Sequence, residues 1–198
     1  MPDKDREARI AQAAYDLLAA RGYGGTSMLA VAKAASASNE TLYRWYGDKA
    51  GLVRALVAQN AAEARERLDR ALADGADPLD SLAETAPILL AMLLSDRAIL
   101  LNRAAAADAT GAVGQALAEA GRGTIAPLVG DLMARAIARG EVAAETPAEA
   151  ADLVLTLLIG DLQIRRATGA LARPDADWIA ARARTAVTRF HRLTAPPA

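Results

Sequence analysis

The sequence predicts an all-α protein in which a small N-terminal helical domain is followed by a larger helical bundle. Hydrophobic residues make up 53% of the chain, alanine is abundant, and aromatic residues make up only 4%. Alanine favours helix because it loses no side-chain entropy there. Apolar residues also recur at helical spacing, and glycines, prolines and capping residues separate the runs. Together these observations predict helices throughout the chain.

The first two helices are marked by an apolar stripe and a glycine-rich turn. The stripe, which predicts a helix over residues 5–21, consists of Ile10, Ala13, Ala14, Leu17 and Leu18. A turn over residues 22–25 ends this helix. Thr26 or Ser27 then caps a short second helix that reaches residue 34 or 35.

A third short helix and a long fourth helix follow. Ser38 is an N-cap candidate for a helix through Trp45, which Gly47 ends. Asp48 caps a helix expected to run to about Asp74. Two short helices backed by a longer first helix are the pattern of a helix-turn-helix. The residues placed to fill its core are Ile10, Ala14, Leu17, Met28, Val31, Leu42 and Tyr46.

Beyond residue 74 the sequence predicts one helix after another, joined by short turns. Asp77 is a cap with Pro78 at the favoured first position, and Thr146 and Glu149 form a capping box. The expected helices span residues 78–95, 96–108, 110–123, 124–139, 147–168 and 177–193. The third of these should be weak or kinked because of its glycines.

The composition excludes several kinds of site. The chain has no cysteine, which rules out disulfides and thiolate chemistry, and its one histidine, His191, cannot form a multi-histidine metal centre. The usual bases and nucleophiles are nearly absent, so we expect no enzyme activity, no metal and no cofactor. The N-terminus is charged, and the longest apolar stretch, residues 88–94, is too short to span a membrane. We therefore expect a cytoplasmic protein with no membrane partner.

The segment from Thr26 to Lys49 resembles the DNA-binding domain of the tetracycline-repressor (TetR) family. The shared features are the Thr26-Ser27 cap, Val31-Ala32, the turn Ser36-Ala37-Ser38, Thr41-Leu42-Tyr43, an aromatic residue at Tyr46, and Lys49. The resemblance covers about residues 6–55. Ser36 departs from it, because the family has a glycine there, which takes a positive φ at little cost.

The C-terminal part carries a second resemblance. Residues 101–108 and 132–142 are similar to AefR-like C-terminal domains. This resemblance implies a helical domain for dimerisation and ligand binding. We therefore expect a helix-turn-helix DNA-binding domain over residues 1–50 and a helical ligand-binding and dimerisation domain over residues 51–198.

The charge distribution also favours DNA at the N-terminal end. Residues 1–55 carry eight Lys and Arg against six Asp and Glu, whereas the remainder carries fifteen against eighteen. The N-terminal residues of a recognition helix point into the major groove. The expected DNA-contacting residues are Thr26, Ser27, Ser38, Asn39, Glu40, Thr41, Tyr43, Arg44, Trp45 and Lys49.

Side-chain chemistry suggests individual roles on the third helix. Asn39 can pair with adenine, and Arg44 with guanine or a phosphate. Glu40 would accept from a cytosine amine or point away from the DNA, and a solvated first turn is the alternative for both Asn39 and Glu40. The resemblance implies a phosphate contact for Tyr43. It also implies a contact for Trp45, with a core position as the alternative.

Three further residues are expected to bind phosphates near helix N-termini. Lys49 lies in the first turn of the long fourth helix, where the backbone amides favour an anion. Thr26 and Ser27 each offer a hydroxyl beside the amides of the second helix. For these two residues, a purely structural capping role is the alternative.

A ligand pocket and a dimer interface are expected in the C-terminal domain. The pocket candidates are Met92, Leu93, Asn102, Arg103, Leu132, Met133, Thr156, Asp161 and Gln163, with ordinary core or solvent positions as the alternative. One recognition helix contacts only about four base pairs, so a homodimer through residues 147–168 and 177–193 is expected. The interface candidates are Leu153, Val154, Leu157, Leu158, Gly160 and Ile164, and Gly160 would allow a partner helix to approach closely.

We therefore predict a homodimeric transcriptional regulator that binds a palindromic duplex operator. In the leading hypothesis it is a repressor that an unidentified small molecule releases from DNA. The helix over residues 48–74 would then carry the signal, because its start touches DNA while its far end packs into the ligand domain. One alternative is a DNA-binding dimer that is constitutive or controlled by a partner. Another is a helical scaffold with a vestigial helix-turn-helix.

Overall fold

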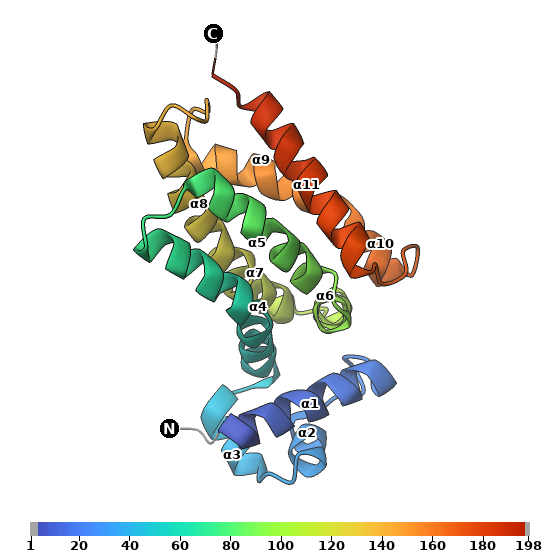
Figure 1. The fold of residues 1–198 in the computed structure, drawn as a ribbon. Helices are drawn as coiled ribbons and strands as arrows, with labels where there is room; N and C mark the ends of the chain where they lie inside the picture. The colour runs from blue at the N-terminus through green and yellow to red at the C-terminus, as the bar shows by residue number, and fades with distance from the viewer. Residues whose placement is uncertain (1–3, 197–198) are drawn as a thin grey trace. The chain divides into compact units, whose positions relative to one another are not determined.

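The computed structural model describes residues 4–196 as helices joined by turns and short loops (Figure 1). The helices are α1 (Lys4–Arg21), α2 (Met28–Ala34), α3 (Asn39–Tyr46), α4 (Lys49–Ala73), α5 (Pro78–Leu93), α6 (Asp96–Ala107), α7 (Ala112–Ala120), α8 (Arg122–Ala138), α9 (Pro147–Ile159), α10 (Leu162–Thr168) and α11 (Ala176–Leu193). The described residues contain no strand, so the all-α prediction is confirmed. Within the same range, no helix is both long and apolar enough to cross a membrane.

The chain folds into two compact units. The first contains the residues up to Asn60 together with Asp96–Gly121, and the second contains Ala61–Ser95 and the residues from Arg122 onward. Neither unit is continuous in sequence, and α4 contributes residues to both. The expected division into residues 1–50 and 51–198 stays a prediction about the domains.

The first unit is built around the three N-terminal helices. α1 packs against α2 and α6, and α2 packs against α3. Ile10, Val31 and Leu42 are fully buried at the centre, as expected, whereas Leu17 and Tyr46 are only partly buried. The side chains that α6 and α7 add to the same core include Leu101, Ala104 and Val113.

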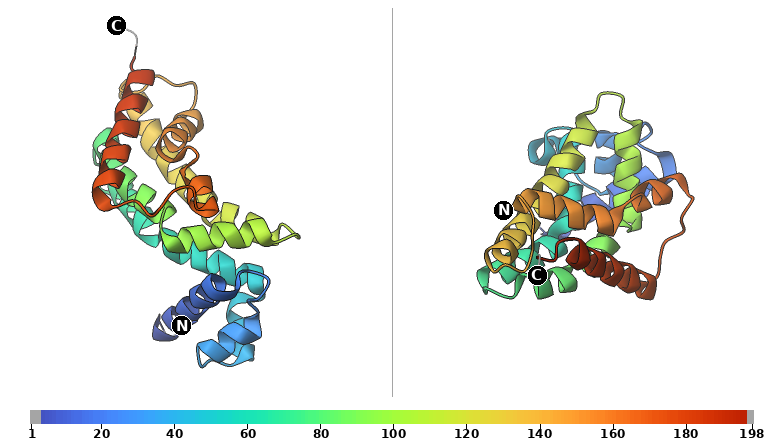
Figure 2. Two further views of the ribbon diagram at one scale, coloured as in Figure 1. Left: turned by 90° about the vertical axis from the view of Figure 1, so that its right-hand side faces the viewer. Right: turned by 90° about the horizontal axis from the view of Figure 1, so that it is seen from above.

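The second unit is a bundle in which α5 packs against α8 and α11, and α9 packs against the same two helices (Figures 1 and 2). Leu90, Leu132 and Phe190 are completely buried in its core. The helix caps expected from the sequence form here. Asp77 accepts hydrogen bonds from the N–H groups of the first turn of α5, and Thr146 accepts one from the first turn of α9.

The expected single helix over residues 147–168 is wrong, because the chain forms α9 and α10 there. Gly160 has a φ of +50° and ends α9, with its N–H donating to the Thr156 carbonyl at 2.9 Å. A right-handed α-helix needs negative φ, so it cannot continue through this residue. Gly160 therefore ends α9, and the close approach of a partner helix at this residue stays a prediction. The expected weak helix over residues 110–123 is also shorter, because α7 ends at Ala120 and α8 begins at Arg122.

The turn between α2 and α3 passes through Ser36, which has a φ of +51°. Among the described residues, Ser36 is the only non-glycine with a positive φ. This conformation brings an L-residue's Cβ close to the following carbonyl oxygen and costs roughly 1–2 kcal/mol. A serine therefore adopts here the positive φ that a glycine would take at little cost.

Replacing Ser36 with glycine should stabilise the first unit. We expect a gain of up to about 1 kcal/mol in the free energy of unfolding, because the steric cost disappears while the unfolded chain becomes somewhat more flexible. Ala34→Gly, at the exposed last residue of α2, should instead destabilise, by less than the roughly 1 kcal/mol that glycine costs in a helix interior. Urea unfolding of both variants measures the difference, and equal losses would contradict the account of the turn.

Candidate nucleic-acid interface

The helix α3 has one buried side and one exposed side. Thr41 and Leu42 are buried, with 8% and 0% of their surface exposed. On the opposite side lie the exposed side chains of Asn39, Glu40, Tyr43 and Arg44. Their spacing of one, three and one residues places them on a single face of the helix. This exposed face, which we call the α3 face, carries an amide, a carboxylate, a phenol and a guanidinium.

Ser38 and Thr41 fix the start of α3 and face each other. The Ser38 hydroxyl oxygen accepts from the Thr41 N–H at 3.0 Å, and the two hydroxyl oxygens are 2.8 Å apart. This is an N-cap, which satisfies one of the otherwise unpaired N–H groups of the first turn. Both hydroxyls are therefore engaged within the helix, and the two residues orient the neighbouring α3 face.

The two hydroxyls before α2 differ in exposure. Thr26 is buried, and its hydroxyl donates to the Gly22 carbonyl at 2.8 Å, closing the preceding turn. Ser27 is exposed and caps α2 by accepting from the Ala30 N–H at 3.1 Å. Ser27 is therefore the only one of the two whose surface is open to a ligand.

Sequence analysis missed two exposed residues of α2. Leu29 is 65% exposed, and Lys33, four residues later, is also exposed on the same side of the helix. Met28 and Val31 occupy the buried side. Helical periodicity could have identified both, because positions 29 and 33 fall outside the apolar stripe.

Trp45 and Tyr46 end α3 in a half-buried position. Trp45 packs against the core of the first unit, and its ring lies 6.3 Å from the Tyr46 ring at an interplanar angle of 74°. This edge-to-face arrangement is favourable for two aromatic rings. The surroundings of Trp45 are therefore mostly those of a core residue, which was the alternative to a DNA contact.

Lys49, at the start of α4, is engaged inside the first unit. Its ammonium donates to the Tyr23 backbone carbonyl and lies 3.5 Å from the centre of the Tyr23 ring. Burial lowers the pKa of Lys49, and the negative charge of Asp108 partly offsets this effect. Lys49 thus links the turn before α2 to α4.

The pocket candidates come from both compact units. Asn102 and Arg103 lie on α6 in the first compact unit, whereas the other candidates belong to the second. Asn102 donates to the carbonyl of Ala98 in its own helix, at 2.9 Å. Among the candidates of the second unit, Leu132 and Met133 are completely buried in the core, Met92 and Leu93 are partly buried, and Thr156 and Asp161 are exposed. Gln163 donates to the Leu93 carbonyl at 3.1 Å, so two candidates do meet.

The interface candidates lie on α9 and α10, with Gly160 between them. Val154 and Leu158 are buried within the second unit, and Leu153 and Leu157 pack partly against its core. Ile164, in contrast, is 69% exposed. Of the apolar candidates, Ile164 therefore leaves the most surface uncovered.

Two family models match the chain. Residues 10–56 match the model of bacterial regulatory proteins of the tetR family, and residues 80–193 match the C-terminal domain of AefR-like transcriptional repressors. The first match contains α2, α3 and the whole α3 face. The second extends over more than half of the chain.

Solved structures share the fold over nearly the full length. A TetR-family regulator from Mesorhizobium loti is 23% identical with a TM-score of 0.77, and covers 98% of this chain and 99% of its own. A TetR regulator from Agrobacterium tumefaciens is 27% identical with a TM-score of 0.74, over 96% and 95%. Thermus thermophilus FadR, a TetR-family repressor in complex with lauroyl-CoA, is 19% identical with a TM-score of 0.64, over 93% and 92%. No curated protein sequence matches the chain. From the two family models and the shared fold, we conclude that this chain belongs to the tetR family of bacterial DNA-binding transcriptional regulators, which are not enzymes, and that its C-terminal part is of the AefR-like class.

Proposed function

We propose that the protein is a homodimeric repressor that recognises a palindromic operator through the α3 face and leaves it when a small molecule binds. The observation that carries this proposal is the exposed set of Asn39, Glu40, Tyr43 and Arg44 on a helix whose other side is buried. An α-helix fits the major groove, and amide and guanidinium groups can each form two hydrogen bonds with a base edge.

In this proposal the residues of α3 divide into two roles. Asn39 and Arg44 contact base edges, and Tyr43, whose side chain is 51% exposed, donates its hydroxyl to a phosphate. Ser27 and the amides at the start of α2 would bind a second phosphate. Ser38 and Thr41 support the α3 face without touching DNA through their hydroxyls.

The experiment that tests DNA recognition is a binding titration with Tyr43→Phe. This variant keeps the ring and loses only the hydroxyl, so we expect affinity for every duplex to fall by about fivefold per hydroxyl lost, the effect of one hydrogen bond of about 1 kcal/mol. The dependence of affinity on salt should not change, because a neutral group displaces no counterion from DNA. Fluorescence anisotropy at several salt concentrations measures both quantities. Unchanged affinity would remove Tyr43 from the interface.

Lys49→Ala should lower the stability of the protein and leave the salt dependence of DNA binding unchanged, because the Lys49 ammonium is engaged with Tyr23. We expect the free energy of unfolding to fall by about 0.5–1 kcal/mol with loss of the cation–π contact, while the salt dependence stays the same. Lys33→Ala, at an exposed site on α2, is the control for stability. If Lys49→Ala instead lowers the salt slope by about one per subunit, Lys49 contacts a phosphate, as the sequence first suggested.

The ligand part of the proposal is supported by the C-terminal match and by the continuity of α4. T. thermophilus FadR, which has the same fold, holds lauroyl-CoA. Here α4 contributes residues to both compact units, so a ligand that shifts its C-terminal half also acts on residues at the DNA-binding end. The coupling typical of such regulators is about 1–3 kcal/mol.

The ligand part is tested by linkage. A thermal-shift screen of small molecules against the full chain identifies a binder, which is then titrated with and without the operator. The proposal expects the operator to weaken ligand binding by the same factor by which the ligand weakens operator binding. Equal ligand affinities in the two titrations would favour a constitutive or partner-controlled regulator.

A further inference from the structure

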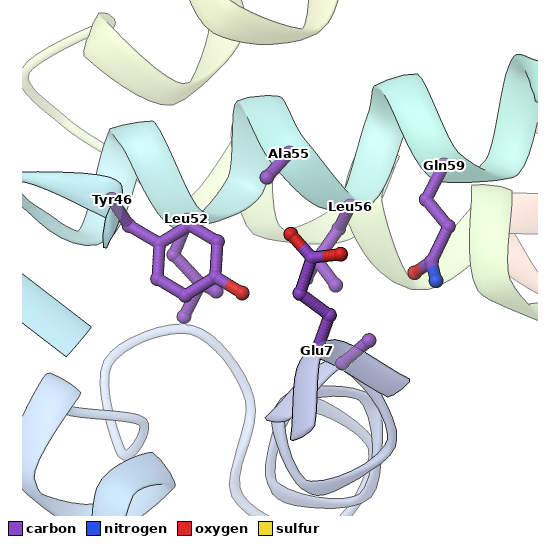
Figure 3. Close-up of a pocket in the computed structure, with 7 residues that line it drawn as sticks. Glu7, Tyr46, Leu52, Ala55, Leu56 and Gln59 are labelled. Carbon is purple, nitrogen blue, oxygen red and sulfur yellow. The ribbon is translucent and has the colours of Figure 1, made fainter. Parts of the chain in front are cut away.

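A small cavity in the first compact unit lies beside the last residue of α3. Its volume is about 110 Å³. The lining residues are Glu7, Ala11, Tyr46, Leu52, Ala55, Leu56 and Gln59. They come from α1, from the end of α3 and from the first half of α4, so all of them belong to one unit. Figure 3 shows the Glu7 carboxylate projecting from α1 between the Tyr46 phenol and the Gln59 carboxamide.

Three polar groups border this cavity, which is partly open to solvent: Glu7 and Tyr46 are partly buried, and Gln59 is exposed. In Figure 3 the side chains of Glu7, Tyr46 and Gln59 point toward the same space. No hydrogen bond joins any two of them in the described part of the chain. The pKa of Tyr46 is raised by burial and, to a smaller extent, by the negative charge of Glu7. Ligand pockets combine apolar walls with a few convergent polar groups, and this cavity has that combination on a smaller scale.

The remaining walls are apolar. Leu52 and Leu56 are only 3% and 2% exposed, and Ala11 and Ala55 complete the lining. An occupant must therefore combine a polar head, directed to the carboxylate, with a short hydrocarbon body. The head must be positive, because a carboxylate repels anions, and the Tyr46 hydroxyl oxygen, which Figure 3 shows on the Glu7 side of the ring, can accept a hydrogen bond from it.

A metal ion does not fit this set of groups. The cavity offers one carboxylate, and no group of three or more metal-ligating acids or histidines exists among residues 4–196. Hard divalent cations require several oxygen ligands, usually with more than one carboxylate. An organic ammonium needs only one anionic partner and a few hydrogen-bond acceptors.

We propose that this cavity binds a small alkylammonium cation, with the ammonium between Glu7 and Tyr46 and the hydrocarbon against Leu52 and Leu56. The volume corresponds to roughly three to four water molecules, which suits a propylammonium-sized ligand. Binding joins α1, α3 and α4, so the ligand stabilises the unit that carries the α3 face. Binding of the cation does not require DNA, because Tyr46 lies on the half-buried side of α3, away from the α3 face.

The test is calorimetric titration of the full chain with propylammonium chloride at constant ionic strength. We expect saturable binding with a millimolar Kd, since a ligand of so few atoms cannot bind tightly. The neutral analogue 1-propanol should bind about tenfold more weakly or worse, because it lacks the charge. Glu7→Gln should weaken propylammonium binding by about tenfold or more. Asp16→Asn, which removes an exposed acid from the same helix, should leave the Kd unchanged.

A second variant tests the cavity itself. Ala55→Leu keeps all three polar groups but fills the space between them, so propylammonium binding should disappear while the circular dichroism spectrum and melting curve show a folded protein. The proposal is overturned if the wild type gives no saturable heat. It is also overturned if Glu7→Gln or Ala55→Leu, still folded, binds propylammonium as well as the wild type.

Discussion

Replacing Asn39 or Arg44 with alanine should change which duplex the protein prefers. Both side chains are exposed on α3, so the fold should remain intact. Each lost bidentate contact with a base should cost about 1–3 kcal/mol of discrimination, which is roughly 5- to 150-fold, at one base pair in each half of the operator. Competition binding against a panel of duplexes with single base-pair changes measures this loss position by position.

The control for charge is Arg65→Ala, because Arg65 is an exposed arginine of α4 in the second compact unit. It should alter neither affinity nor preference. A uniform loss of affinity in Arg44→Ala, with preference retained, would assign Arg44 to a phosphate. If the preference survives both Asn39→Ala and Arg44→Ala, base recognition by the α3 face is wrong.

Ile164→Asp should give monomers and lower the affinity for a palindromic operator toward the non-specific level, about 10³-fold weaker or more. Ile164 is 69% exposed on α10, so a charge there should leave the fold intact but be costly in an apolar interface. A monomer reaches only one half-site at a time, and the gain from two-fold symmetry is then lost. Light scattering gives the mass, and anisotropy gives the operator affinity.

Leu157 is a less suitable position for this test. Its side chain packs partly against the core of the second unit, so a charge there would also disturb the fold. Gln115→Asp, at an exposed position of α7, is the matched control and should remain dimeric. A dimeric Ile164→Asp with full operator affinity would place the interface elsewhere.

Local hydrogen bonding explains which parts of the fold could be predicted from the sequence. Ser27, Ser38, Asp77 and Thr146 all cap helices as expected, because a cap needs only a side chain and the amides two or three residues later. The positive φ at Ser36 was indicated by the family resemblance, because the family has a glycine at that position. The expected contact residues followed from the geometry of a recognition helix and of helix N-termini and, for Tyr43 and Trp45, from the family resemblance, and the structure shows which of them are exposed.

Contacts between distant segments explain what could not be predicted. Gly160 was expected inside one helix, since a glycine in an apolar run is compatible with helix until the chain has to turn. The engagement of Lys49 with Tyr23 joins residues 26 positions apart, and periodicity contains no information about such a pair. The packing of α6 into the first unit, which carries Asn102 and Arg103 with it, also joins segments far apart in the sequence, and the place of these two residues beside a ligand stays a prediction.

The small cavity beside Tyr46 was missed for a related reason. It requires residues from three helices, and the sequence indicates only that Glu7 is a polar residue near the N-terminus and that Tyr46 is an aromatic core candidate. Their proximity depends on the packing of α1 and α4 around the end of α3. The periodicity of each helix alone does not indicate how the three helices pack against one another.

The measurement that tests the central claim most directly is a hydroxyl-radical footprint of the full chain on a duplex selected from a random library. The account predicts two protected half-sites, separated by about 34–36 Å or one helical turn of DNA, with protection that weakens as salt is raised. Both half-sites should lose protection in the Asn39→Ala, Arg44→Ala double variant. A selected duplex that shows no protection, or one that the double variant protects as well as the wild type, would contradict the claim that the α3 face recognises DNA.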